Sequence, residues 1–178
     1  MKTLLTIFFA LLTFTVIGQS EPKILKLRLD TCKYSKKQIG ASTINGNPIY
    51  IANGIIVNST YVNPDSVVTY DIVICPESFK RYMYIGSQGA IVMDTKQSFE
   101  FTTPKQIKEN KKITGDVLFA INSLLLLDSS FKISPDAINE IEFTNSVDPF
   151  DGKTLKPCIN IWTIPKKDRE KYFIYTVR

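Results

Sequence analysis

Two halves of the chain carry the same backbone signals in the same order, and this repetition limits the folds that the sequence can adopt. In the first half, a Gly and a polar residue precede an apolar run over 48–57 that contains Asn53. In the second half, the same signals precede an apolar run over 117–127 that contains Asn122, 69 residues further on. The first run also carries a hairpin signal, Asn53-Gly54, so it is predicted to be a strand that folds back on itself.

A proline-led signal recurs after each apolar run. Asn63-Pro64-Asp65 in the first half corresponds to Ser134-Pro135-Asp136 in the second half, 71 residues later. Asn and Ser cap helices, Pro fits the first helical position, and Asp is favoured at the positive end of the helix dipole. A short helix is therefore expected at each site. Unrelated strand-turn-helix units also resemble one another, but a polar cap, Pro and Asp in register with the flanking strands favour an internal duplication.

The first half is predicted to follow the order β-α-β-α-β. Its later strands are expected over 70–75 and 90–96, and Phe79, Tyr82 and Met83 between them predict a two-turn amphipathic helix over 77–85. Gly86 is a candidate C-cap that ends this helix. We expect Gly86 and Gly89 to adopt positive φ, with Ser87 at the exposed tip between them, and to lead the chain into the next strand.

The second half is a degenerate copy of the first. Residues 159–163 match 91–95 at an offset of 68, but the region from Val147 to Pro157 is rich in Pro and Gly. This composition predicts a loop where the first half has a helix.

These patterns predict an α+β fold of two β-α-β(-α)-β units, the second degenerate, with additional terminal strands over 24–32 and 172–177. The polar segment 98–112 is interpreted as a linker. The expected divisions are a signal peptide over 1–18, an N-terminal strand and loop over 19–45, a first unit over 46–104, a linker over 105–114 and a second unit over 115–178.

The N-terminus predicts export. Lys2 precedes an uncharged apolar run over 3–17, and Val16 and Gly18 suit a cleavage site before Gln19. The run is shorter than the roughly 20 residues of a spanning helix, which favours cleavage over a retained anchor. We therefore expect a periplasmic, outer-membrane-associated or secreted protein. Its 22 Lys and Arg are interleaved with 17 Asp and Glu, so no nucleic-acid partner is expected.

The residue types available for chemistry exclude several enzyme classes. The chain has no His, which excludes Ser-His-Asp triads, Cys-His dyads and His-ligated metal centres. Cys32, Cys75 and Cys158 allow at most one internal disulfide, with three possible pairings, and their spacing matches no metal motif. The carboxylates show no informative pairing. We therefore expect no catalytic residue, no metal and no cofactor.

The first half resembles the plug domain of TonB-dependent outer-membrane receptors, and most closely the small plug-like units of Bacteroidetes envelope proteins. In that family a YGS-x-G turn leads into a final strand that ends in TTK, and here YIGSQG at 84–89 leads into AIVMDTK at 90–96. The resemblance covers 46–96 well and 115–167 weakly. An acidic residue of the family's first turn is replaced by Asn53, and the second copy lacks the glycine turn.

This resemblance implies a tandem, plug-like protein that works by docking, in association with outer-membrane TonB-dependent uptake. Transport itself is not expected to follow from the fold, because the sequence is too short to add the receptor's membrane-spanning part. The predicted function is thus a non-catalytic interaction module that binds an envelope protein, first of all through an exposed sheet edge. A plug that associates with a separately encoded receptor, and a small secreted enzyme that uses a Cys or a carboxylate pair, remain as alternatives.

Overall fold

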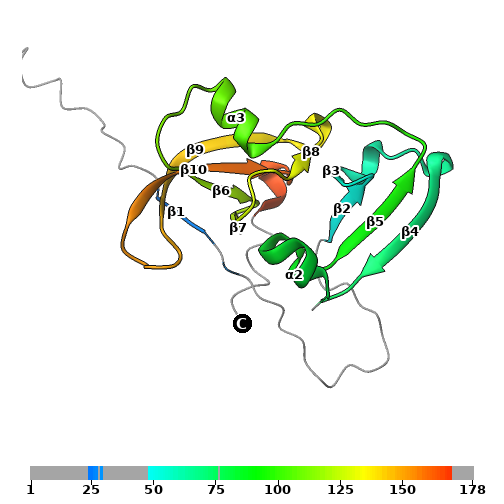
Figure 1. Ribbon diagram of the computed structural model, residues 1–178, viewed down its shortest axis with the longest axis horizontal. Helices are drawn as coiled ribbons and strands as arrows, with labels where there is room; N and C mark the ends of the chain where they lie inside the picture. Colours follow the sequence, from blue (N-terminus) through cyan, green and yellow to red (C-terminus); the bar gives the residue numbers. More distant parts are fainter. Residues whose placement is uncertain (1–23, 28, 30–47, 76, 170–178) are drawn as a thin grey trace, which may run out of the picture.

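The computed structural model describes residues 24–27, 29, 48–75 and 77–169, which form two mixed β-sheets with short helices, an α+β fold (Figure 1). The signal peptide expected over 1–18, Cys32 and the strand expected over 172–177 lie outside the described residues. Within the described ranges, no helix has the length and apolar character needed to cross a membrane.

The first sheet has the strand order β4-β5-β2-β3-β8. Its hairpin β2–β3 turns at Asn53 and Gly54, whose φ angles are 51° and 77°, as the Asn-Gly signal predicted. Strand β5 runs parallel to β2 and antiparallel to β4. The strands are β2 (Ile49–Ala52), β3 (Ile55–Val57), β4 (Val67–Val73), β5 (Ala90–Thr95) and, from the second half of the chain, β8 (Lys132–Ile133).

The second sheet has the strand order β1-β9-β10-β6-β7. Hairpin β6–β7 turns at Asn122 and Ser123, β10 is parallel to β6 and antiparallel to β9, and β1 adds to β9 in parallel. The strands are β1 (Ile24–Lys26), β6 (Leu118–Ile121), β7 (Leu124–Leu126), β9 (Glu140–Val147) and β10 (Leu155–Trp162).

Four strands of each sheet are connected and aligned in the same way. In the first sheet Ala52 lies opposite Met93, and in the second Ile121 lies opposite Ile161. The same correspondence holds across the antiparallel pairs, where Val73–Ala90 matches Thr144–Cys158 and Ala52–Ile55 matches Ile121–Leu124. These equivalences have the offsets of 69, 71 and 68 that recur in the sequence. The repeated signals therefore direct both halves along a common backbone path.

Two α-helices and several 3₁₀ turns connect the strands. The two proline-led signals form single 3₁₀ turns that lead into β4 and β9. The elements are η1 (Ser59–Tyr61), η2 (Pro64–Ser66), α2 (Glu77–Tyr82), η3 (Met83–Gly86), α3 (Pro104–Asn110), η4 (Pro135–Ala137) and η5 (Lys166–Asp168).

The helix expected over 77–85 ends at Tyr82, and only part of its predicted apolar face is covered, since Phe79 and Tyr82 are half-buried. Ser78, Ile85 and Gly86 are buried, whereas Met83 is exposed. The reason is that α2 ends at Tyr82 and Met83 adopts a φ of 52°, so that the helical spacing does not continue into η3.

Two other segments differ from the sequence interpretation. The polar segment read as a linker contains α3, which begins with a capping box between Thr103 and Gln106 and buries Ile107. Pro157, expected in a loop, lies in β10 opposite Asn145 of β9. A proline is compatible with this place because the pairing of β10 with β6 begins only at the next residue.

A single main core joins the two sheets, which lie side by side in Figure 1 with β8 between them. It combines residues of both sheets with Ile85 of η3 and Ile107 of α3. Its buried members are Ile51, Ile56, Ile85, Ile107, Ile121, Leu124, Leu126, Ile133, Ala137, Ile159 and Ile161. A smaller group on the opposite face of the first sheet, here called the outer cluster, consists of Ala52, Ile55, Val57 and Met93.

Candidate functional site

The proline-led motif residues lie where the chain enters β4 and β9, and their contacts are architectural. The Asn63 side chain accepts a hydrogen bond from the backbone N–H of Asp65 at 3.0 Å, as expected for a cap. Ser134 differs, because its side chain makes no capping bond. Its backbone N–H instead donates to the carbonyl of Ile56 at 2.8 Å and so connects the second half to β3. Pro64, Pro135 and Asp136 complete the two turns.

The glycine turn is also architectural, and two expectations about it are wrong. Gly89 has a φ of 97°, as predicted, but Gly86 does not have positive φ. Gly86 is required by close packing instead, because a Cβ there would lie 2.4 Å from the backbone oxygen of Ser78. Ser87, expected at an exposed tip, is instead half-buried, because the turn packs against the end of the parallel ladder, where the Gly89 carbonyl accepts from the Ile49 N–H.

Asn53 and Asn122 hold the hairpins against the last strand of each repeat. The Oδ1 atom of Asn53 accepts from the backbone N–H of Thr95, and that of Asn122 accepts from the N–H of Thr163, each at 2.9 Å. Sequence reasoning detected the recurrence of these asparagines but did not assign them this role. The available signal was the pair of threonines at the ends of these strands, Thr95 as the last residue of β5 and Thr163 directly after β10.

The two cysteines in the described ranges differ, because one is bridged and the other is a buried thiol. Cys75 is disulfide-bonded, and Cys158 is a free thiol that is 2 % exposed. Of the three pairings that the sequence allowed, the free thiol of Cys158 removes two. Burial, with a smaller effect of the Glu142 carboxylate, raises the pKa of Cys158 to about 12. This thiol is therefore neutral at physiological pH and is not activated as a nucleophile.

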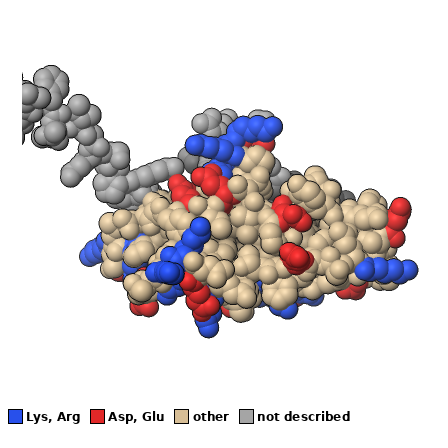
Figure 2. Space-filling model, turned by 90° about the horizontal axis from the view of Figure 1, so that it is seen from above, with Lys and Arg blue, Asp and Glu red and all other residues tan. Residues whose placement is uncertain are grey.

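Two carboxylates with shifted pKa values, Asp148 and Asp151, are engaged in local structure. In the loop between β9 and β10, the Asp148 carboxylate contacts the Lys156 ammonium at 2.7 Å. Asp151 accepts from Thr154 and from two backbone N–H groups, which lowers its pKa to about 2. In the described ranges, no three potential metal ligands come together. Figure 2 shows acidic and basic side chains mixed over one face, without an extended patch of one sign.

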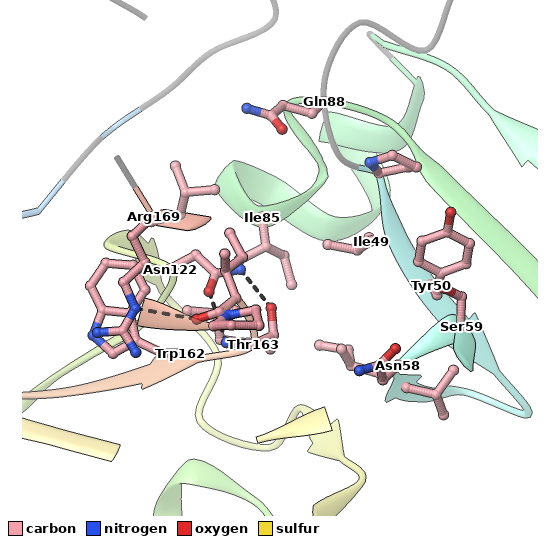
Figure 3. Close-up of a pocket in the computed structure, with 17 residues that line it drawn as sticks. Ile49, Tyr50, Asn58, Ser59, Ile85, Gln88, Asn122, Trp162, Thr163 and Arg169 are labelled. Carbon is pink, nitrogen blue, oxygen red and sulfur yellow. Dashed lines mark hydrogen bonds between the residues drawn. The ribbon is translucent and has the colours of Figure 1, made fainter. Parts of the chain in front are cut away.

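A cavity of about 330 Å³ lies between the two sheets, lined by the ends of β6 and β10 on one side and by β2 and β3 on the other (Figure 3). The Arg169 guanidinium lies 4.1 Å from the centre of the Trp162 ring and pairs with Glu140 at 2.6 Å. The Trp162 N–H donates to Glu142 at 2.9 Å. The cavity wall is mixed in character, with apolar side chains such as Ile121 and Leu124 beside polar ones such as Asn58 and Gln88. No carboxylate of the described residues lines it, so it holds no acid-base pair.

The edge strand β4 carries an exposed row of apolar side chains. Val68, Tyr70 and Ile72 are 60 %, 70 % and 46 % exposed, and these three residues are here called the apolar row. Tyr70 lies opposite Met93 and Ile72 lies opposite Ile91 on β5. Directly opposed residues share a face of the sheet, so Tyr70 and Ile72 extend the outer cluster to the surface, while Val68 lies at a β-bulge between Val67 and Thr69.

The free side of β4 makes this row a candidate binding site. Within the described ranges, β5 is the only strand paired with β4, which forms the end of the molecule furthest from the second sheet in Figure 1. An unpaired edge presents backbone donors and acceptors that another extended chain can use. The strand that corresponds to β4 in the second sheet, β9, pairs with the additional strand β1 at its outer edge.

Searches of protein-family models, curated proteins and solved structures found no match to this chain.

Proposed function

We propose that this chain is an exported, non-catalytic protein-interaction module of the cell envelope that binds an extended segment of a partner at β4. The observation that carries the proposal is the outer edge of β4, which no described strand pairs, with its apolar row exposed beside it. Strand addition at such an edge supplies backbone hydrogen bonds, each contributing about 0.5–1.5 kcal/mol net, and buries the row against alternate side chains of the partner.

The proposal includes two plug-like units, the second degenerate. Its support is the common strand order and register of the two sheets, together with the resemblance of 46–96 to receptor plugs. On the basis of that resemblance, the proposal also includes association with outer-membrane TonB-dependent uptake. The alternative of a thiol enzyme gains no support from the described cysteines, because one is bridged and the other is buried with a raised pKa.

Site-specific photo-crosslinking in cells tests this function. A photoreactive phenylalanine analogue is placed at Val68 or Ile72, in the apolar row, and at Phe101 as a control. Phe101 is 46 % exposed and lies outside β4. We expect positions 68 and 72 to yield a covalent adduct with one and the same envelope protein, identified by mass spectrometry, and position 101 to yield none.

The contrary result is equally defined. If the three positions give the same adducts, or if positions 68 and 72 capture no protein other than this chain itself, then β4 is not the docking edge of an envelope partner and the proposed function is wrong.

A further inference from the structure

The described sheet edges are unequal, and only β4 is both long and uncovered. Strand β8 has two residues, and its Ile133 forms an isolated bridge with Thr102 on a neighbouring segment. Strand β7 is buried along its whole length and packs against η3. Strand β1 has three residues. In contrast, β4 has seven residues and an exposed, largely apolar surface, the kind of edge that folded proteins normally protect.

The sequence of β4 is complementary to itself when two copies run antiparallel. A β-bulge lies between Val67 and Thr69, so the regular part of β4 begins at Thr69. With Tyr70 opposite Tyr70 of a second copy, Thr69 meets Asp71, and Ile72 meets Val68 beside the bulge. Aromatic and β-branched pairs of this kind are favourable cross-strand neighbours.

From this complementarity we propose that β4 of a second copy of this chain pairs with β4, so that the two first sheets join across a twofold axis at Tyr70. This inference rests on the proposed function, because it names the strand that occupies β4 while no envelope partner is bound. The interface is isologous and uses the same edge of both copies. It therefore closes at two chains rather than growing into a fibre.

Charge and register favour this arrangement over other antiparallel pairings. Asp71 is the one charged residue of β4. Centring the pair on Asp71 would bring two carboxylates directly opposite each other, whereas centring it on Tyr70 puts each carboxylate opposite Thr69 of the other chain. A shift by a single residue would set the apolar row of one copy against Thr69 and Asp71 of the other. The Tyr70-centred pairing instead makes the outer clusters of both copies continuous.

Charge complementation at Tyr70 tests the dimer. The full mature chain is studied by sedimentation velocity over a range of concentrations as wild type, Tyr70→Lys, Tyr70→Glu and Phe150→Lys. Phe150 is a matched control, because it is an exposed aromatic residue (65 % exposed, against 70 % for Tyr70) in the loop between β9 and β10. Since Tyr70 is exposed, its replacement leaves the core intact, which circular dichroism verifies.

We expect the wild type and Phe150→Lys to dimerise equally in a concentration-dependent manner. Tyr70→Lys and Tyr70→Glu alone should each dimerise at least about tenfold more weakly, because like charges then face each other across the axis. An equimolar mixture of these two variants should recover the dimer. A monomeric wild type at all concentrations, or a mixture no better than its components, would overturn the inference.

The two experiments distinguish failure of the dimer from failure of the proposed function. A monomeric purified protein whose positions 68 and 72 still crosslink to an envelope protein removes the dimer and leaves the proposed function. A Tyr70-dependent dimer whose row crosslinks only to itself removes the envelope partner and leaves β4 as a self-pairing edge.

Discussion

At the residue scale, the two hairpin turns solve the same backbone problem with different side chains. The second position of the turn is Gly54 in the first half and Ser123 in the second, and both have positive φ, 77° and 65°. Gly adopts this conformation freely, whereas Ser is strained there. The Ser123 N–H donates to the Oδ1 atom of Asn160 at 3.0 Å, but the Ser123 hydroxyl is buried without a hydrogen-bond partner among the described residues. The second turn is therefore the less favourable of the two.

This difference predicts opposite effects for reciprocal substitutions. Ser123→Gly should raise the free energy of unfolding by about 1 kcal/mol, because it removes both the backbone strain and the unsatisfied hydroxyl. Gly54→Ser should lower the free energy of unfolding by about 1 kcal/mol, because it introduces the strain into an otherwise open site. Urea denaturation of both variants and the wild type measures this, and a loss of stability in Ser123→Gly would contradict the explanation.

Cys158 predicts a pH dependence of stability. Burial raises its pKa from the ordinary value of 9.0 to about 12, so the folded state retains the thiol proton at a pH where the unfolded state has lost it. The resulting stabilisation is fully present below about pH 9 and is lost as the pH rises toward 12, at roughly 1.4 kcal/mol per pH unit.

The measurement is the difference in unfolding free energy between the wild type and Cys158→Ala, in incubations too short for thiol–disulfide exchange. Titrations of Tyr and Lys are common to both proteins and cancel in this difference. We expect the advantage of the wild type to shrink between pH 9 and pH 11. A constant difference over that interval would mean that the buried thiol ionises normally.

At the scale of elements, the sequence was informative where the structural signal is local. Asn53-Gly54 and the two proline-led turns are determined by the backbone preferences of a few adjacent residues. The hairpin turn forms as expected, and each proline-led signal forms a single 3₁₀ turn, without the expected side-chain cap at Ser134. Helix α3 was missed because Pro104 and Ile107 are its only apolar residues, too few for a periodic pattern, although its capping box was readable. The pairing of β3 with β8 joins distant segments, which no local pattern encodes.

The candidate site likewise combines a local feature, which the sequence shows, with a long-range one, which it does not. The apolar alternation of Val68, Tyr70 and Ile72 is visible in the sequence, and a binding edge was the expected mechanism. The sequence did not reveal that β4 is the unpaired edge, because strand order depends on which segments meet in the folded chain. The sequence also suggested the wrong reason for Gly86. A glycine is needed there because of the close contact with Ser78, and not because of a positive φ angle.

At the scale of the whole molecule, the shared core makes the two sheets depend on each other. Ile133 is fully buried in the main core, and β8, which contains it, belongs to the second half but completes the sheet of the first. Sheets that share a core in this way are expected to unfold together rather than as separate domains.

Ile133→Ala tests this cooperativity. The substitution should cost about 2–5 kcal/mol and should lower both sheets' stability in a single transition. Fluorescence of Trp162, the one Trp of the chain, reports on the second sheet, while hydrogen exchange of β2 and β5 amides reports on the first. We expect coincident midpoints for both probes. Early loss of the first sheet with unchanged Trp162 fluorescence would show that the repeats are independent.

The placement of β8 also has a consequence for synthesis. A nascent chain that has emerged only as far as β5 contains both strands of the first hairpin but not the segment that covers β3. Until Lys132 and Ile133 leave the ribosome, β3 has no β8 to pair with, and its edge is open to pairing with other chains. Premature termination between the repeats should therefore yield insoluble fragments, and chaperone binding should be strongest during that interval of translation.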